Sequence, residues 1–263
     1  MSSSQWTAAA LAVVACLGTG RAMAQDEVTL DEATAMLAAG DPDQIQAGIE
    51  ALGLIGTPRI IEPLAQRIRR GLPRDLLSSA VEILGMLARP EAGPILFELA
   101  THRRPDVRLA AVNAITACRP SGAERALVVG LSDSDPRVRS AAAVGLGELG
   151  ARGQVDTLFL ALDRGILEAA TAVGRLVDGP QVGRLLEHLG RLPFDVVSPG
   201  LNEVLARAEI PERVKLEVIA RLQELATPDV KAFLQELLAS LPQRRGRDAI
   251  RQAVQDAIER IVD

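Results

Sequence analysis

The chain has 263 residues, of which 48% are hydrophobic and 24% are charged, and its formal net charge is −5. The hydrophobic share excludes a disordered chain, and the acidic balance argues against a nucleic-acid binder that relies on a basic surface. Two cysteines, Cys16 and Cys118, are too few for a scaffold held together by disulfides.

Residues 1–24 have the features of an export signal. Residues 8–18, AAALAVVACLG, form an apolar run that is too short to span a bilayer. The small residues Ala22 and Ala24 fit the rule for signal peptidase, which predicts cleavage between Ala24 and Gln25. We therefore expect an exported bacterial protein that resides in the periplasm.

The same segment allows a second form of export. Residues 13–16, VVAC, loosely resemble a bacterial lipobox, in which Cys16 would be lipidated and become the first residue of an envelope lipoprotein. No later apolar stretch reaches the roughly 20 residues that a membrane helix needs. The sequence thus predicts no membrane span and leaves a lipid anchor as the alternative.

We expect residues 25–40 to form an N-terminal capping helix. Thr29 and Glu32 have the spacing of a capping box, in which each side chain accepts a hydrogen bond from the other residue's backbone N–H.

Residues 41–192 contain five copies of a repeat of about 31 residues, by direct subtraction of residue numbers. One proline series falls at Pro42, Pro73, Pro105 and Pro136, and a second follows about half a repeat later at Pro58, Pro90 and Pro120. Proline suits the first turn of a helix, where its missing N–H would have no partner anyway. Two proline series therefore predict two helices per repeat, which we call the first and the second helix.

The segment 135–163 shows this pattern most clearly. Asp135 before Pro136 is a suitable N-cap, and Gly150 ends the first helix. The apolar residues of this helix fall on one face at helical spacing, at Val138, Ala141, Ala142, Gly145, Leu146 and Leu149. The second helix is expected over residues 154–163.

Glycines recur near the ends of the first helices, at Gly53, Gly85, Gly147 and Gly174. Because glycine lowers helix propensity, its repetition predicts that a neighbouring helix approaches closely there. Cys118 lies near such an end and is expected to be a small buried residue.

The register changes after residue 192. Pro193, Pro199 and Gly200 interrupt it, so residues 193–210 are expected to form an irregular, shortened repeat. The pattern returns over residues 211–226, which align with the first helices, and residues 228–240 follow as the partner. Residues 211–263 are thus expected to form a C-terminal repeat that ends in an amphipathic capping helix.

The segment 133–150 reads D-x-D-P-R-V-R-x-A-A-A-x-G-L-G-E-L-G. It resembles the short HEAT repeat, in particular that of the phycobilisome-lyase-like subfamily. The resemblance covers residues 41–192 well and 211–240 less well. It implies an all-α fold, a right-handed α-solenoid, with the first helices on the convex side and the second helices on the concave side.

Catalytic signatures are missing from the sequence. Hydroxylases that resemble this type of repeat array carry paired His-Glu metal ligands. This chain has only two histidines, His102 and His188, and no His-Glu dipeptide. Phosphate-binding and nucleophile motifs are absent too, and four Phe without Tyr suit a bilin site poorly. We therefore expect no catalytic residues, no metal and no cofactor, and predict that the chain is not an enzyme.

Solenoids bind partners across their inner surface. Aligned second helices place Val129 and Leu160 in a column that is otherwise polar, beside Arg125, Asp156 and Arg164. These five residues are the candidate partner-binding site. A slight rotation of the helices would instead bury the two apolar residues.

The sequence thus favours a non-catalytic, exported scaffold or adaptor that binds a protein or peptide through its concave face and binds no nucleic acid. Two alternatives stay open. One is a lyase-like or enzyme-accessory protein that holds a small ligand, and the other is a structural envelope lipoprotein.

Overall fold

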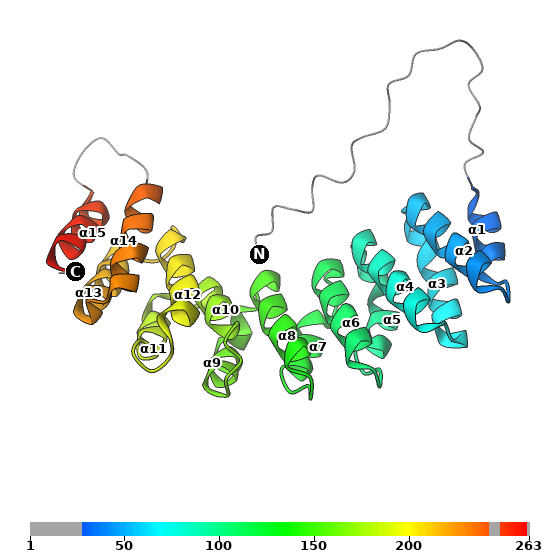
Figure 1. Ribbon diagram of the computed structural model, residues 1–263, viewed down its shortest axis with the longest axis horizontal. Coiled ribbons are helices and arrows are strands. Elements are labelled where there is room, and N and C mark those ends of the chain that lie inside the picture. The colour runs from blue at the N-terminus through cyan, green and yellow to red at the C-terminus, as the bar shows by residue number, and fades with distance from the viewer. Residues whose placement is uncertain (1–27, 242–247, 262–263) are drawn as a thin grey trace, which may run out of the picture.

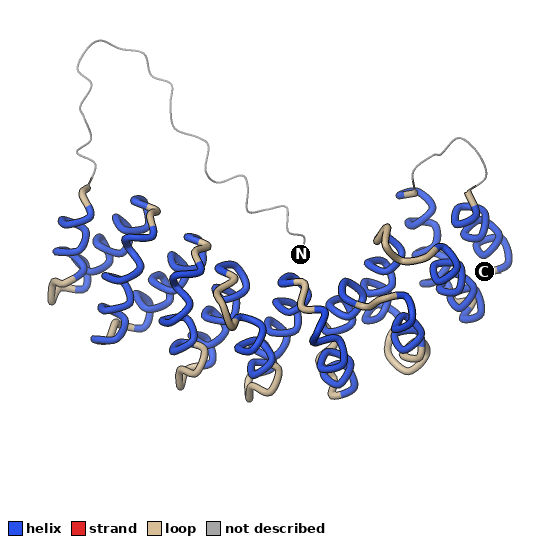
Figure 2. Tube along the Cα trace, turned by 180° about the vertical axis from the view of Figure 1, so that it is seen from behind, coloured by secondary structure: helices blue, strands red, loops and turns tan. Residues whose placement is uncertain are grey.

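The computed structural model describes residues 28–241 and 248–261 (Figure 1). The expected export signal, including Cys16, Ala24 and Gln25, lies outside these residues. The described chain is a curved stack of helix pairs without a β-strand (Figures 1 and 2). This confirms the predicted all-α, right-handed α-solenoid.

The stack begins with α1 (Leu30–Leu37), where the predicted capping box is present. The Thr29 hydroxyl accepts from the backbone N–H of Glu32 at 3.3 Å, and the Glu32 carboxylate accepts from the N–H of Thr29 at 2.9 Å. Two orphan N–H groups at the start of the helix are thereby satisfied.

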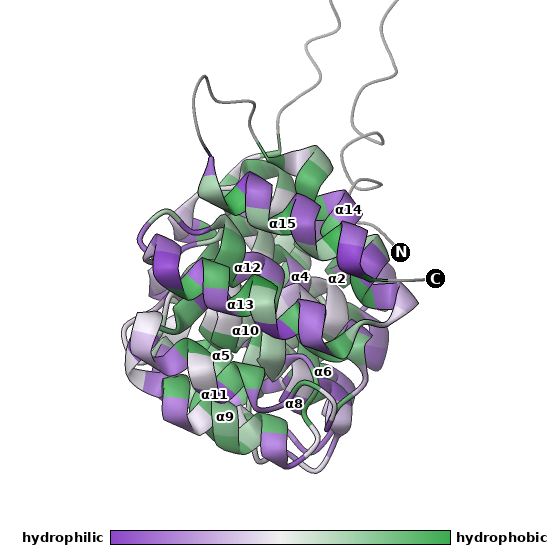
Figure 3. Cartoon of the chain, turned by 90° about the vertical axis from the view of Figure 1, so that its left-hand side faces the viewer, coloured by the Kyte–Doolittle hydropathy of each residue, from purple (hydrophilic) through white to green (hydrophobic). Residues whose placement is uncertain are grey.

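Five pairs of a first and a second helix follow α1. The first helices are α2 (Pro42–Ile55), α4 (Arg74–Leu87), α6 (Pro105–Cys118), α8 (Pro136–Leu149) and α10 (Ala169–Leu176). The second helices are α3 (Ile61–Arg70), α5 (Gly93–Leu99), α7 (Ala123–Gly130), α9 (Val155–Asp163) and α11 (Val182–Leu186). Seen along the stack, α9 and α11 lie on one side and α6 and α8 on the other, so the two kinds of helix form two rows (Figure 3).

Prolines start several of these helices as expected. Pro42, Pro105 and Pro136 each occupy the first position of a first helix. The second proline series starts short 3-10 turns instead, η1 (Pro58–Ile60) and η2 (Pro90–Ala92), which lead into α3 and α5. Similar turns, η3 (Arg152–Gln154) and η4 (Gly179–Gln181), precede α9 and α11.

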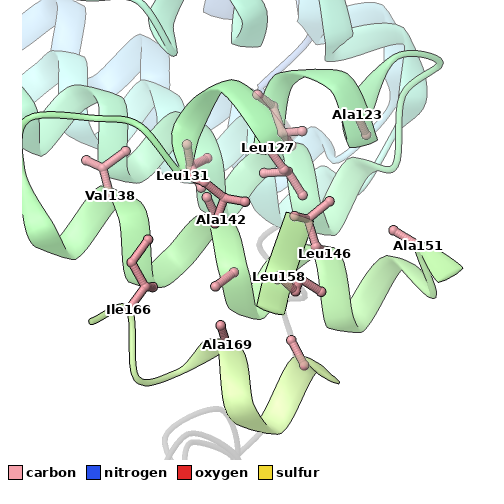
Figure 4. Packing of buried hydrophobic residues seen from close by; sticks show 14 of the residues in the cluster. Ala123, Leu127, Leu131, Val138, Ala142, Leu146, Ala151, Leu158, Ile166 and Ala169 are labelled. Atoms are coloured by element: carbon pink, nitrogen blue, oxygen red, sulfur yellow. The ribbon is translucent and has the colours of Figure 1, made fainter. Parts of the chain in front are cut away.

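A continuous apolar core runs between the two rows. Leu127 of α7, Leu146 of α8 and Leu158 of α9 are fully buried and gather at one point of it (Figure 4). The described part of the chain buries only one uncharged polar residue, Thr116, whose hydroxyl donates to the Val112 carbonyl at 3.0 Å. The fold is therefore held by packing of aliphatic side chains between neighbouring repeats.

First helices approach each other through the repeated glycines, as predicted. A Cβ atom at Gly85 would lie 3.3 Å from the Cβ of Ala114 in the next first helix, and one at Gly147 would lie 3.0 Å from the Cα of Ala172. Gly174 touches backbone, because a Cβ there would lie 2.6 Å from the carbonyl carbon of Gly200. Neighbouring first helices are therefore in close contact at these glycines.

The segment that was expected to be irregular is a helix. Residues 194–206 form α12 (Phe194–Ala206), with Pro199 in its interior. Proline removes the hydrogen bond to the carbonyl four residues earlier, at Asp195. Both Pro199 and Asp195 are exposed, so water can satisfy that carbonyl and the helix continues.

The last helices are α13 (Glu212–Leu225), α14 (Pro228–Ser240) and α15 (Ala249–Arg260). Gly179 at the start of η4 lies against Pro211 and Val214, and Gly190 after α11 lies near Leu225. These contacts place α13 beside α11 and parallel to it. The helix therefore extends the row of second helices, which differs from the expectation that it takes the role of a first helix. The expected domain boundaries stay a prediction.

Candidate functional site

The two apolar residues of the predicted column lie on the surface. Val129 of α7 is 65% exposed and Leu160 of α9 is 54% exposed. Their neighbours Leu127, Leu158 and Phe159 are at most 1% exposed, since they point from the opposite side of the helices into the core. The alternative, that helix rotation buries Val129 and Leu160, is therefore wrong.

Two arginines flank these residues without a partner. Arg125 and Arg164 are exposed, and neither side chain makes an ion pair or a hydrogen bond with another residue in the described ranges. Their guanidinium groups, each with five N–H donors, are free to bind an anionic group.

Asp156, the third charged residue of the predicted site, is bound to the next repeat. Its carboxylate forms a close ion pair with Arg184 of α11, and the guanidinium carbon of Arg184 lies 4.0 Å above the centre of the Phe159 ring. Asp156 therefore joins α9 to α11 and presents no free negative charge beside Leu160. Sequence columns could not reveal this pair, because the two residues stand at different positions of their helices.

His188 belongs to the same contact between α9 and α11. Its Nε2 lies 3.0 Å from Oδ1 of Asp163, its Nδ1 lies 2.9 Å from the Arg184 carbonyl oxygen, and its ring stacks on Phe159 with 6.1 Å between centroids. Both ring nitrogens are occupied. In the described parts of the chain, no three His, Cys, Asp or Glu side chains gather as metal ligands would.

A further ion pair joins the first turn of α6 to the loop before α8. Arg108 of α6 donates to both carboxylate oxygens of Asp133, at 2.7 and 2.6 Å. Asp133 also accepts from the backbone N–H of Asp135 at 2.8 Å. The Arg108 guanidinium holds the pKa of the Asp133 carboxyl below its usual value. The repeat pattern of the sequence did not predict this pair, whose members lie 25 residues apart.

The second helices around α7 are separated by hollows. The hollow between α5 and α7 has a volume of about 400 Å³, and the one between α7 and the start of α9 has about 660 Å³. Val129 and Arg125 line both. Arg125 and Val129 thus lie on a ridge, formed by α7, between two open grooves, whereas Leu160 and Arg164 line neither groove.

Cys118 is buried as expected. It is 2% exposed, and its Sγ lies 3.3 Å from the carbonyl oxygen of Leu84. Burial raises the pKa of its thiol, which favours the unreactive protonated form.

No helix in the described residues is both long and apolar enough to cross a membrane.

Comparison with known proteins supports the fold. No curated protein matches the sequence significantly. A chain of a homology model of the full-length AP-3 complex in an intermediate open conformation is 17% identical, with a TM-score of 0.54 over 89% of this chain, which spans 51% of that one. At such identity the likeness shows the fold alone.

Two further solved structures are similar at lower TM-scores. The complex of CpcE and CpcF of phycocyanin lyase from Nostoc sp. PCC7120 is 16% identical and has a TM-score of 0.48, covering 94% of this chain and 100% of that one. A designed armadillo repeat protein in complex with the peptide (KR)4 is 18% identical and has a TM-score of 0.43, covering 89% and 99%.

A family model supplies the identity of the repeats. Residues 93–174, from α5 to α10, match the model of HEAT repeats. Helix pairs of the same kind continue on both sides of this segment. Residues 93–174 are thus HEAT repeats.

Proposed function

We propose that the chain is a non-catalytic scaffold or adaptor, exported to the periplasm, that binds a protein or peptide partner along its second helices. The proposed contact is centred on Val129 and Leu160, with Arg125 and Arg164 beside them. The expectation that this row of helices forms the concave face is part of the proposal.

One observation carries the proposal. Val129 and Leu160 are exposed at 65% and 54% on successive second helices, next to arginines without partners. Apolar side chains that become buried in a complex, together with arginine, tend to supply most of the binding free energy at an interface. The exposure of Val129 and Leu160 on successive second helices, beside arginines without partners, therefore supports a binding surface there. Leu54 of α2 and Met86 of α4, on the row of first helices, are also exposed, at 90% and 76%.

Surface substitutions test this proposal. Val129→Asp and Leu160→Asp each place a charge at the proposed contact without touching the core, so the melting temperature should stay near that of the wild type. Affinity for a partner recovered with the wild-type protein should fall about 30-fold or more, which corresponds to about 2 kcal/mol. Normal binding by both folded variants would contradict the proposed surface.

The control needs an exposed arginine away from α7 and α9. Arg139 is unsuitable, because its Nη1 donates to the carbonyl oxygens of Asp133 and Ser134 at 2.9 and 3.1 Å. Arg59 in η1 is exposed, and its side chain makes no ion pair or hydrogen bond with another described residue, so Arg59→Glu should leave binding unchanged.

Export is tested by the intact mass of the mature protein. Cleavage after Ala24 gives a chain that begins at Gln25 and, because Trp6 is removed, absorbs almost no light at 280 nm. A mass that retains residues 17–24 and includes acyl chains on Cys16 would instead establish the envelope lipoprotein. An unprocessed mass from the cytoplasmic fraction, with no processed form in the envelope or periplasm, would contradict both forms of export.

A further inference from the structure

Ion pairs bridge the gap from α3 to α5 and the gap from α9 to α11, but not the two gaps beside α7. Arg69 of α3 binds Glu98 of α5 at 2.8 Å, and Arg184 of α11 binds Asp156 of α9. No ion pair or side-chain hydrogen bond joins α7 to α5 or to α9, all three of which lie wholly within the described residues. The surface is therefore open on both sides of α7 and bridged further along the stack.

The groove between α5 and α7 is mainly apolar. Its walls include Phe97 and Ala100 from α5 and the loop after it, and Ala126 and Val129 from α7. Its volume of about 400 Å³ lies in the lower part of the range of ligand pockets, about 300–1,000 Å³. An apolar side chain from a partner would lose contact with water here and gain packing contacts with both helices.

The polar groups that line this groove are satisfied internally, with one exception. The carboxylate of Asp133 is bound by Arg108, and the Thr101 hydroxyl donates to the Glu98 carbonyl at 2.9 Å. Arg125 is the one charged side chain lining this groove that has no partner among the described residues. The groove therefore combines an apolar floor with a single free positive charge.

The groove on the other side of α7 is lined by charges of both signs. Glu124, Arg119 and Arg125 all line it, and Arg119 keeps its positive charge while it donates to the Glu148 carbonyl at 2.7 Å. A partner carboxylate there would face the unpaired carboxylate of Glu124, whereas the one carboxylate that lines the groove between α5 and α7, that of Asp133, is bound by Arg108.

We propose that the groove between α5 and α7 binds an apolar side chain of a partner segment that carries an Asp or Glu next to it. The apolar side chain enters between Phe97 and Val129, and the carboxylate pairs with Arg125. Arginine binds carboxylates through parallel N–H donors, which fixes orientation as well as charge. This inference rests on the proposed function and names the chemistry of its partner.

The test uses three short fluorescent peptides of equal length. The first has Leu-Phe at its centre flanked by glutamates, the second has lysines in place of the glutamates, and the third has Ser-Ser in place of Leu-Phe. The wild-type protein should bind the first peptide about tenfold tighter than either other in fluorescence anisotropy. Equal binding of the glutamate and lysine peptides would overturn the proposal.

Two variants test the charge of Arg125 and the apolar groove independently. Arg125→Glu should invert the preference, so that the lysine peptide becomes the tighter ligand; a gain of binding cannot come from misfolding. Ala126→Phe fills the groove and should weaken binding of the glutamate peptide about tenfold, while Arg59→Glu should not. If neither Arg125→Glu nor Ala126→Phe changes the order or strength of binding, the groove is not the site.

Binding of the partner recovered for the proposed function distinguishes the scaffold function from the groove proposal. Loss of that partner in Leu160→Asp together with full binding by Ala126→Phe leaves the scaffold function standing and refutes the groove. Loss of binding in both variants supports both. Full binding in both refutes both.

Discussion

Replacement of Gly174 by alanine tests how tightly the first helices are packed. A Cβ at this position would lie 2.6 Å from the Cα and the carbonyl carbon of Gly200 in α12. The obstacle is backbone, so no side chain can rotate away. Overpacking costs up to about 3 kcal/mol, while alanine contributes about 1 kcal/mol of helix propensity over glycine. We expect Gly174→Ala to lower the free energy of unfolding by about 2 kcal/mol.

Thermal and urea unfolding followed by circular dichroism measure this effect. For a chain of this size, about 2 kcal/mol corresponds to a fall in melting temperature of about 4–8 °C. Gly183→Ala is the matched control, because no heavy atom lies within 4 Å of a Cβ at Gly183 in α11. The control should be neutral or gain up to about 1 kcal/mol. If Gly174→Ala melts at the wild-type temperature, the close approach of α10 and α12 is wrong.

Two further predictions concern the core and the loops. Leu146 is fully buried, so Leu146→Ala should cost about 2–5 kcal/mol in urea unfolding; a variant as stable as the wild type would contradict its place in the core. Because Arg108 lowers the pKa of Asp133, the ion pair stabilises the fold above the pKa of the unfolded carboxyl, about 3.9, and the contribution is lost as pH falls through the lower folded pKa. Asp133→Asn should therefore be less stable at pH 7 and lose less stability on acidification, and an unchanged pH dependence of unfolding would refute the role of this pair.

The close approach of the first helices could be predicted from sequence alone. Glycine is unfavourable inside a helix, so its recurrence at one position of successive first helices needs a reason outside the helix. The structure provides that reason at Gly85, Gly147 and Gly174, where alanine or glycine of the next first helix occupies the space of a side chain. The alignment of second helices placed Val129 and Leu160 in a polar column but left their burial open, and the structure shows that both are exposed.

Contacts between repeats were harder to predict. The pair of Asp156 with Arg184 and the contact of His188 with Phe159 depend on how far one helix pair is rotated against the next. Spacing along the chain contains no information about that rotation. The alignment of columns therefore identified the exposed face of α9 but did not identify Arg184 as the partner of Asp156.

The position of α13 shows a second limit of prediction from the sequence. Apolar residues at helical spacing describe both kinds of helix, so the match of residues 211–226 to the first helices rested on a pattern that second helices share. The contacts of Gly179 with Pro211 and Val214 decide the matter. Proline was also weak evidence for a break, because Pro199 lies on the exposed side of a continuous helix.

The different spacing of the two rows explains why binding is expected on the second helices. First helices pack through Gly and Ala so closely that no side chain of a partner could enter between them. Second helices carry larger side chains such as Phe97 and stand further apart, which leaves grooves at their surface. Where Arg69–Glu98 and Asp156–Arg184 bridge neighbouring helices, opposite charges neutralise each other. On either side of α7 no such bridge forms, and the free guanidinium of Arg125 therefore makes this part of the surface favour an apolar and acidic partner over a basic one.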